Sequence, residues 1–186
     1  MRALIAILLT TPLLFSQEGK YETKLGTETL EMLGGVAYRH GDGRADQAMG
    51  TRLASGLNRW MSLYGEFGYS RLIAETIYQP VKAEAKGSIM DIGGGGELHL
   101  SGSRVQPFIQ AGIGTVRVSA KVAVAYLKET ESSYRFSSQL GGGVRIFATR
   151  NVGFSAEMKT FTINEGGRFE RYALGIFYQH GPRPLW

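Results

Sequence analysis

Hydrophobic and polar residues alternate along eight short stretches of this chain, the first of which begins at residue 29. Alternation with a period of two is typical of a β-strand whose two faces meet different surroundings. Each stretch is close to the ~9–11 residues that a tilted strand needs to cross a bilayer. The eight strands predicted in this way span residues 29–38, 49–58, 61–74, 87–100, 106–119, 135–148, 152–162 and 168–179.

The connections between these strands alternate between short and long. Short turns are predicted at 57–60, 101–104 and 149–151, and outer loops at 39–48, 75–86, 120–134 and 164–167. A single-chain outer-membrane barrel has tight turns in the periplasm and longer loops outside the cell. We therefore predict an all-β fold, an eight-stranded antiparallel up-and-down transmembrane β-barrel with short periplasmic turns and longer outer loops. The barrel spans residues 29–180, after an N-terminal periplasmic segment at 18–28 and before a C-terminal tail at 181–186.

The two faces of each strand differ in bulk as well as in polarity. In the strand at 135–148, Leu140 and Val144 share one face, while Gln139 and Gly143 share the other. An eight-stranded barrel has an interior just wide enough for side chains to fill, so small and charged residues suit it best. We predict that the bulky apolar face meets lipid. The alternative, a lipocalin-like soluble barrel, would have an aromatic and aliphatic interior.

The inward face then carries charges of both signs on neighbouring strands. Buried charges must be paired and hydrogen-bonded. We predict a closed polar network in the lumen that plugs the barrel, and the alternative is a narrow wet pore lined by the same residues. The network consists of Glu66, Glu97, Arg145, Glu157 and Lys159, and Glu31, Arg52, Asp91 and Arg171 also face inward.

Aromatic residues fall near the predicted strand ends. That placement is typical of the girdles that outer-membrane barrels form at both membrane interfaces, although β-propensity also favours aromatic residues in strands. The predicted girdle consists of Tyr38, Trp60, Tyr64, Tyr69, Tyr78, Phe108, Tyr134, Phe147, Phe169, Tyr172 and Tyr178.

The first residues have the pattern of a signal peptide. Arg2 supplies the positive charge, and the apolar run at 3–15 is shorter than the ~20 residues of a membrane-spanning helix. We predict a cleaved signal peptide at 1–17, export to the periplasm and a final location in the cell outer membrane.

Composition narrows the possible chemistry. The chain has no cysteine, which excludes a thiolate nucleophile, a disulfide framework and a Cys-ligated metal. Its formal charge of +5 is not gathered into a Lys/Arg cluster, so no nucleic-acid partner is expected. The glycine runs at 93–96 and 141–143 lack the residues that complete a phosphate-binding loop. His40, Asp42 and Asp46 do not complete a calcium loop, so we predict no cofactor and no metal.

Several segments resemble the small eight-stranded outer-membrane barrels, the OmpA N-terminal/OmpX-like group that is called the outer membrane protein beta-barrel domain. These segments are 64–69 (YGEFGY), 105–114 (VQPFIQAGIG), 139–147 (QLGGGVRIF) and 151–159 (NVGFSAEMK). The resemblance implies a non-enzymatic protein with a structural or surface-interaction role through its outer loops. It also implies assembly by the outer-membrane insertase. Gly175 and Tyr178 match the insertase signal of that group, while His180 stands where a second aromatic residue is expected.

Two other functions are weighed against this interpretation. Some small barrels are lipid A deacylases that use a His-x-Ser pair, and His99 and Ser101 have that spacing. Both residues fall on the inward face, and Gly102 stands where that group has asparagine, so we predict that the protein is not an enzyme. The remaining alternative is a narrow passive channel.

Basic residues gather on the predicted outer loops and the adjoining strand ends. Guanidinium and ammonium groups on the outer loops would lie at the level of the lipopolysaccharide phosphates, which accept charge-assisted hydrogen bonds. We predict outer-membrane lipid and lipopolysaccharide as partners of a monomeric barrel. The basic rim consists of Arg39, Arg71, Lys82, Lys86, Arg117, Lys121 and Lys128.

Overall fold

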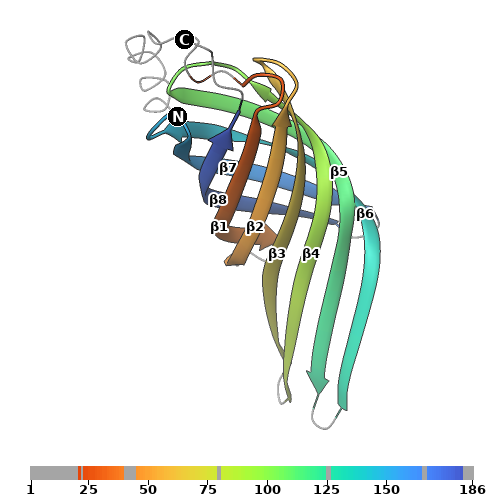
Figure 1. Cartoon of the computed structure of the whole chain (residues 1–186). Helices are drawn as coiled ribbons and strands as arrows, with labels where there is room; N and C mark the ends of the chain where they lie inside the picture. Colours follow the sequence, from red (N-terminus) through yellow and green to blue (C-terminus); the bar gives the residue numbers. More distant parts are fainter. Residues whose placement is uncertain are drawn as a thin grey trace, which may run out of the picture.

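Eight antiparallel strands form one closed barrel in which each strand pairs with its neighbours in sequence and β1 pairs with β8 (Figure 1). The computed structural model describes residues 21, 23–39, 45–78, 81–124, 127–164 and 167–181, and gives the backbone alone at 39, 45, 72–78, 81–86, 120–124 and 127–131. No helix in these ranges is long and apolar enough to cross a membrane. The predicted fold class is confirmed. The strands are β1 (Glu28–Arg39), β2 (Ala45–Gly56), β3 (Met61–Tyr78), β4 (Val81–His99), β5 (Val105–Val124), β6 (Leu127–Phe147), β7 (Val152–Ile163) and β8 (Gly167–His180).

The short connections lie together at one end of the barrel, which we call the turn end. β1 begins and β8 ends there as well. In the β2–β3 turn, Asn58 Oδ1 accepts hydrogen bonds from the backbone N–H groups of Trp60 and Met61, at 2.8 and 3.0 Å. In the β6–β7 turn, the Thr149 hydroxyl accepts one from the N–H of Val152 at 3.1 Å. Such side-chain acceptors stabilise tight turns, and the three predicted short turns are confirmed.

The other end of the barrel differs from the sequence prediction. β3 to β6 contain 18 to 21 residues each, while the remaining four strands contain 12 to 14. The predicted loops at 75–86 and 120–134 are therefore mostly strand, and only 79–80 and 125–126 separate the paired strands. The prediction ended each strand at the thickness of a bilayer, but pairing within a hairpin continues wherever both strands supply suitable residues. Valine stands at 116, 118, 122 and 124, and β-branched residues of this kind favour strand pairing.

The extended parts of these four strands form what we call the projecting sheet, which comprises residues 71–78, 81–88, 117–124 and 127–136. Figure 1 shows the four strands running well past the ends of their neighbours. β2 pairs with β3 only as far as Ser70, and β7 pairs with β6 only from Ser137. Residues 71–78 pair only with β4, and residues 127–136 pair only with β5. Among the described residues, no strand pairs with the other side of either segment, so these two segments are the edges of the projecting sheet.

The two faces of the barrel wall have the predicted polarity. Leu140 and Leu174 are 67% and 72% exposed on the outside, and Ile176 and the half-buried Val144 share that face. Arg52 is fully buried inside. An apolar exterior around a charged interior is the reverse of a soluble barrel and is the pattern of a membrane-spanning one.

The aromatic girdle is only partly as predicted. Tyr38, Trp60, Tyr134, Tyr172 and Tyr178 are exposed on the outside. Four other members of the predicted girdle are buried in the lumen, because strand alternation decides the face of a residue whatever its distance from the strand end. These four are Tyr64, Phe108, Phe147 and Phe169. The Tyr78 side chain lies outside the described residues.

Candidate functional site

Arg52 on β2 is the centre of the lumen network. Its Nε and Nη2 donate to Glu66 Oε2 at 2.9 and 2.6 Å, and its Nη1 donates to Glu31 Oε2 at 3.1 Å. Nη2 also lies 2.5 Å from Glu157 Oε2, across the lumen. Strand register places Glu31 and Glu66 directly opposite Arg52 on its two neighbouring strands. The guanidinium group therefore binds three carboxylates from three strands.

Arg145 on β6 joins a further carboxylate to this centre. Its guanidinium pairs with both oxygens of Glu97, and its Nη2 donates to Glu31 Oε2 at 3.0 Å. Glu31 thus accepts hydrogen bonds from Arg52 and Arg145 at once. The ion pairs of Arg52 and Arg145 are therefore joined through Glu31 and are not separate bridges.

Glu66 is the second point at which cations converge. Lys159 Nζ donates to Glu66 Oε2 at 2.7 Å, and Arg171 pairs with Glu66 Oε1. Arg171 also reaches Asp91, with 3.6 Å between Nη1 and Oδ1. The network thus draws on strands β1 to β4 and β6 to β8.

All five residues assigned to the network from sequence lie in the lumen and take part in these contacts. The sequence pattern predicts that Arg52 and Glu31 face inward but not that they belong to the network, and in the structure they connect its parts. Gln110 was not singled out, and it donates to Glu157 Oε2 at 3.2 Å. Alternation along a strand finds inward residues, but register between strands decides which of them meet.

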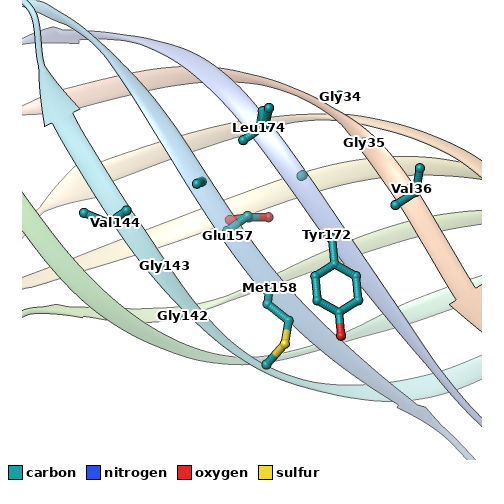
Figure 2. Close-up of a pocket in the computed structure, with 12 residues that line it drawn as sticks. Gly34, Gly35, Val36, Gly142, Gly143, Val144, Glu157, Met158, Tyr172 and Leu174 are labelled. Carbon is teal, nitrogen blue, oxygen red and sulfur yellow. The ribbon is translucent and has the colours of Figure 1, made fainter. Parts of the chain in front are cut away.

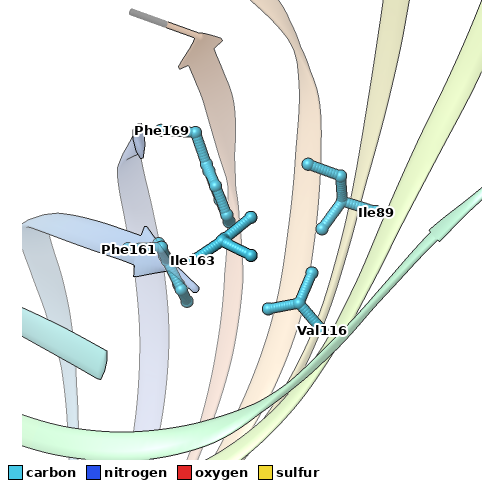
Figure 3. Close-up of a cluster of buried hydrophobic side chains, with 5 residues drawn as sticks. All are labelled: Ile89, Val116, Phe161, Ile163 and Phe169. Atoms are coloured by element: carbon cyan, nitrogen blue, oxygen red, sulfur yellow. The ribbon is translucent and has the colours of Figure 1, made fainter. Parts of the chain in front are cut away.

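Apolar side chains close the lumen on both sides of the network. Towards the projecting sheet, Phe161 and Phe169 stack with 4.3 Å between ring centroids and an interplanar angle of 5°. Figure 3 shows Ile163 beside these rings, with Ile89 and Val116 completing the buried cluster. We call this cluster the outer apolar layer.

At the turn end, a second group of rings covers the network. Phe147 lies 4.9 Å from both Phe177 and Tyr21, measured between ring centroids. The backbone N–H of Tyr21 donates to the carbonyl of Gly102 at 3.3 Å, which holds this part of the N-terminal segment against the barrel. Charged groups between two apolar layers are shielded from bulk water at both ends.

Glycines on β3 and β4 make room for polar side chains in the lumen. A Cβ added to Gly68 would meet the carboxylate of Asp91 and the guanidinium of Arg171. A Cβ on Gly93 would likewise run into the side-chain amide of Gln139. Side chains from β8 and β6, and that of Asp91 on the adjacent strand, therefore occupy the space that these glycines leave.

We expect the wild-type protein to give no steady conductance in planar lipid bilayers, because the ion network and both apolar layers fill its lumen. The measurement is single-channel recording, with a heat-modifiable gel shift of the same preparation as the control for folding. Sustained conductance from the folded protein would favour the narrow-channel alternative.

The two residues of the candidate catalytic pair have other partners. His99 Nε2 lies 2.9 Å from the Ser62 hydroxyl and 3.4 Å from Glu97 Oε1. The Ser101 hydroxyl donates instead to the Ser103 hydroxyl at 2.8 Å. His99 and Ser62 are both almost fully buried, so this contact faces the lumen. Among the described side chains, no group of three His, Asp or Glu residues is placed to hold a metal ion.

The predicted basic rim is only partly described. Arg71 and Arg117 are exposed on the outward face, and the Arg117 guanidinium lies 5.6 Å from the centroid of the Tyr134 ring. Register brings Lys86 and Lys121 directly opposite each other on β4 and β5. The side chains of Arg39, Lys82, Lys86, Lys121 and Lys128 lie outside the described residues.

No family model and no curated protein matches this chain by sequence. Solved structures do match it in fold. Ail, the attachment invasion locus protein of Yersinia pestis, in complex with the heparin analogue sucrose octasulfate, has a TM-score of 0.61 at 13% identity, over 84% of this chain and 99% of Ail. OprG from Pseudomonas aeruginosa also has a TM-score of 0.61, at 10% identity, over 87% of this chain and 99% of OprG.

The outer-membrane enzyme PagL matches with a TM-score of 0.50 at 17% identity, over 81% of this chain and 98% of PagL. An outer-membrane enzyme thus shares this architecture with the other outer-membrane proteins that match, and the fold alone does not show whether a chain is an enzyme. Together with the closed barrel and its apolar exterior, these matches confirm that the chain has the fold of the small eight-stranded outer-membrane β-barrels.

Proposed function

We propose that this protein is a non-enzymatic barrel of the outer membrane that carries the projecting sheet outside the cell as a surface for anionic saccharide groups, including lipopolysaccharide phosphates. The apolar exterior of the barrel and its outer-membrane structural neighbours support the location. The filled lumen argues against transport, and the separate partners of His99 and Ser101 argue against deacylase chemistry.

The sorting of charges in the projecting sheet carries this proposal. Residues that are opposite in register, or two apart along a strand, share a face. By this rule six of the seven predicted rim residues share the face of Arg117, with Glu75 and Glu84 as the acidic positions there. Glu129 and Glu131 fall on the other face, opposite Val122 and Ala120. The six basic positions are Arg71, Lys82, Lys86, Arg117, Lys121 and Lys128.

A face with six basic and two acidic positions attracts anions, and the attraction weakens as salt screens it. The ligand bound to Ail, sucrose octasulfate, is a polyanionic sugar. Phosphate groups of lipopolysaccharide offer similar acceptors for lysine and arginine. We infer a modest, salt-sensitive attraction spread over the face.

Binding to lipid vesicles with and without lipopolysaccharide, at low and high salt, tests this role. The barrel is held in nanodiscs, and the test variant is Lys86→Gln with Lys121→Gln. We expect this variant to bind lipopolysaccharide vesicles at least about threefold more weakly than wild type at low salt. The reason is that two positive charges, which lie opposite each other in register, are lost from the basic face. The matched control is Glu129→Gln with Glu131→Gln, on the other face, which should not weaken binding. Equal binding by wild type in all four conditions would contradict the proposal.

The proposal also includes export, assembly, oligomeric state and the absence of a cofactor, which the sequence predicts and the described residues do not test. A signal peptide at 1–17 directs export, the outer-membrane insertase folds the barrel, and the folded protein is a monomer without a cofactor. The signal peptide and most of the tail at 181–186 lie outside the described residues.

A further inference from the structure

The three short turns at the turn end carry one arginine each. Arg59 lies in the β2–β3 turn, Arg104 in the β4–β5 turn and Arg150 in the β6–β7 turn, and all three are exposed. Because these turns join successive strand pairs around the barrel, the arginines are spread along the rim rather than gathered in one patch. We call these three residues the turn-end arginines.

Acidic residues do not balance this charge. The described residues of the turn end are 23–28, 56–62, 99–105, 147–152 and 180–181, and within these ranges Glu28 is the only acidic residue. Lys24 adds a fourth exposed cation there. No ion pair between described residues involves a turn-end arginine. The described part of the turn end therefore has a net positive surface.

Contacts within the protein hold two of these guanidinium groups at the level of the turns. The Arg59 guanidinium lies 4.7 Å from the centroid of the Trp60 ring, which is a cation–π contact. Arg104 Nε donates to the backbone carbonyl of Phe147, the last residue of β6, at 2.8 Å. Each group keeps further N–H donors for a ligand, since a guanidinium group has five.

Exposed apolar residues accompany the turn-end arginines, each within four positions along the chain. Side chains of these two kinds are typical of a membrane interface, where the apolar groups reach the hydrocarbon and the charges meet the headgroups. The exposed apolar residues are Leu57, Trp60, Leu100 and Val152.

Beyond the turns, the outward face of the wall is uncharged. Figure 2 shows part of this wall, with Val144, Met158 and Leu174 on the neighbouring strands β6, β7 and β8. The outward positions of β7, every second residue from Val152 to Thr162, include no charged residue. The turn-end arginines therefore lie where this uncharged wall ends.

We propose that the turn-end arginines bind the phosphate groups of anionic phospholipids in the leaflet that surrounds the turn end. This inference rests on the proposed outer-membrane location, which places the turn end in the periplasm, and its partner differs from the lipopolysaccharide of the opposite leaflet. A guanidinium group binds phosphate through directed, charge-assisted hydrogen bonds. A headgroup with a net negative charge is favoured over a zwitterionic one, because the positive turn end attracts the net charge.

The alternative partner is an anionic polymer of the periplasm, such as peptidoglycan. Two observations favour lipid. The arginines are spread along the rim, and lipid headgroups surround a barrel on all sides. The exposed side chains of Leu57, Leu100 and Val152 stand near them, and these would meet hydrocarbon in a bilayer but water beside a polymer.

The test uses Trp60 as a local reporter of lipid binding. The chain has two tryptophans, so Trp186→Phe leaves Trp60 as the sole one. The full chain is folded into vesicles of phosphatidylcholine and phosphatidylglycerol, in which one lipid or the other is brominated on its acyl chains near the headgroup. We expect brominated phosphatidylglycerol to quench Trp60 at least about twofold more than brominated phosphatidylcholine at low salt, and the difference to shrink at high salt.

Adding Arg59→Gln to this chain should abolish the preference for phosphatidylglycerol at Trp60. The matched control is Arg117→Gln, which also removes an exposed guanidinium beside an aromatic ring, 5.6 Å from the centroid of Tyr134, but at the other end of the barrel. This control should keep the preference. The heat-modifiable gel shift of each preparation confirms folding.

A second reporter tests another turn. Val152→Trp, in a chain with Trp60→Phe and Trp186→Phe, places the sole tryptophan two positions from Arg150. We expect the same preference for phosphatidylglycerol at this reporter, and we expect Arg150→Gln to abolish it.

Equal quenching by the two brominated lipids, or a preference that survives Arg59→Gln and Arg150→Gln at their own reporters, would overturn the proposal. Binding of the detergent-solubilised protein to purified peptidoglycan, if lost when all three arginines are replaced with glutamine, would overturn the choice of lipid. None of the glutamine variants at the turn end changes the projecting sheet. A failure here therefore leaves the lipopolysaccharide result of the lysine variant unaffected, and the two proposals fail separately.

Discussion

Replacing Arg52 with methionine is expected to lower the free energy of unfolding by about 3–5 kcal/mol, the range for breaking a buried ion pair by removing one partner. Arg52 is fully buried and donates to Glu31, Glu66 and Glu157. Methionine fills similar space but leaves these carboxylates short of a cation. The measurement is equilibrium urea unfolding of the barrel in lipid vesicles, followed by the heat-modifiable gel shift.

The matched control is Arg168→Met on β8. Arg168 pairs with Glu170 at 3.4 Å, but its side chain is 54% exposed. Exposed pairs contribute about 0.2–1 kcal/mol, so this change should be small. A double variant, Arg52→Met with Glu66→Gln, should be more stable than the sum of its single changes predicts, because both partners are then removed. Equal losses in Arg52→Met and Arg168→Met would contradict the network as a source of stability.

The second large effect is expected on the lipid-facing side. Leu174→Arg should cost about 2–4 kcal/mol, because it places a charge near the middle of the bilayer. Leu174 is 72% exposed and lies in the middle of β8, between Gly34 and Ala156 on the neighbouring strands. Folding yield and urea midpoint in vesicles measure the cost.

The control for depth is Val152→Arg, at the first residue of β7 beside the turn end. An arginine near the interface extends its charge to the headgroups, and its cost should be only about 0–1 kcal/mol. If Leu174→Arg folds as well as Val152→Arg, the outer surface at Leu174 does not face the hydrocarbon core, and the proposed membrane location is wrong.

Which residues face inward could be predicted from the sequence because alternation is a local property. The alternation of their own strands alone predicts that Glu66, Arg145 and Lys159 face the lumen, and each is buried there. The short turns were predictable for the same reason, since Asn58 and Thr149 stabilise them within a few residues. Fold class followed from eight such local patterns and their spacing.

Other features depended on the whole barrel. Arg52 is the centre of the network because closure sets the register that brings Glu31 and Glu66 opposite it, and a third strand supplies Glu157 from across the lumen. Phe161 and Phe169 form a layer because β7 and β8 pair with these residues opposite each other. No single strand contains that information.

The projecting sheet was not predictable for a related reason. The projecting sheet exists because β3 to β6 pair beyond the ends of their neighbours. The sequence by itself determined the two faces of each strand, since a side chain's face depends only on its neighbours along the chain. Tertiary structure alone decided which residues meet, because register and strand length result from pairing energies summed around the closed barrel.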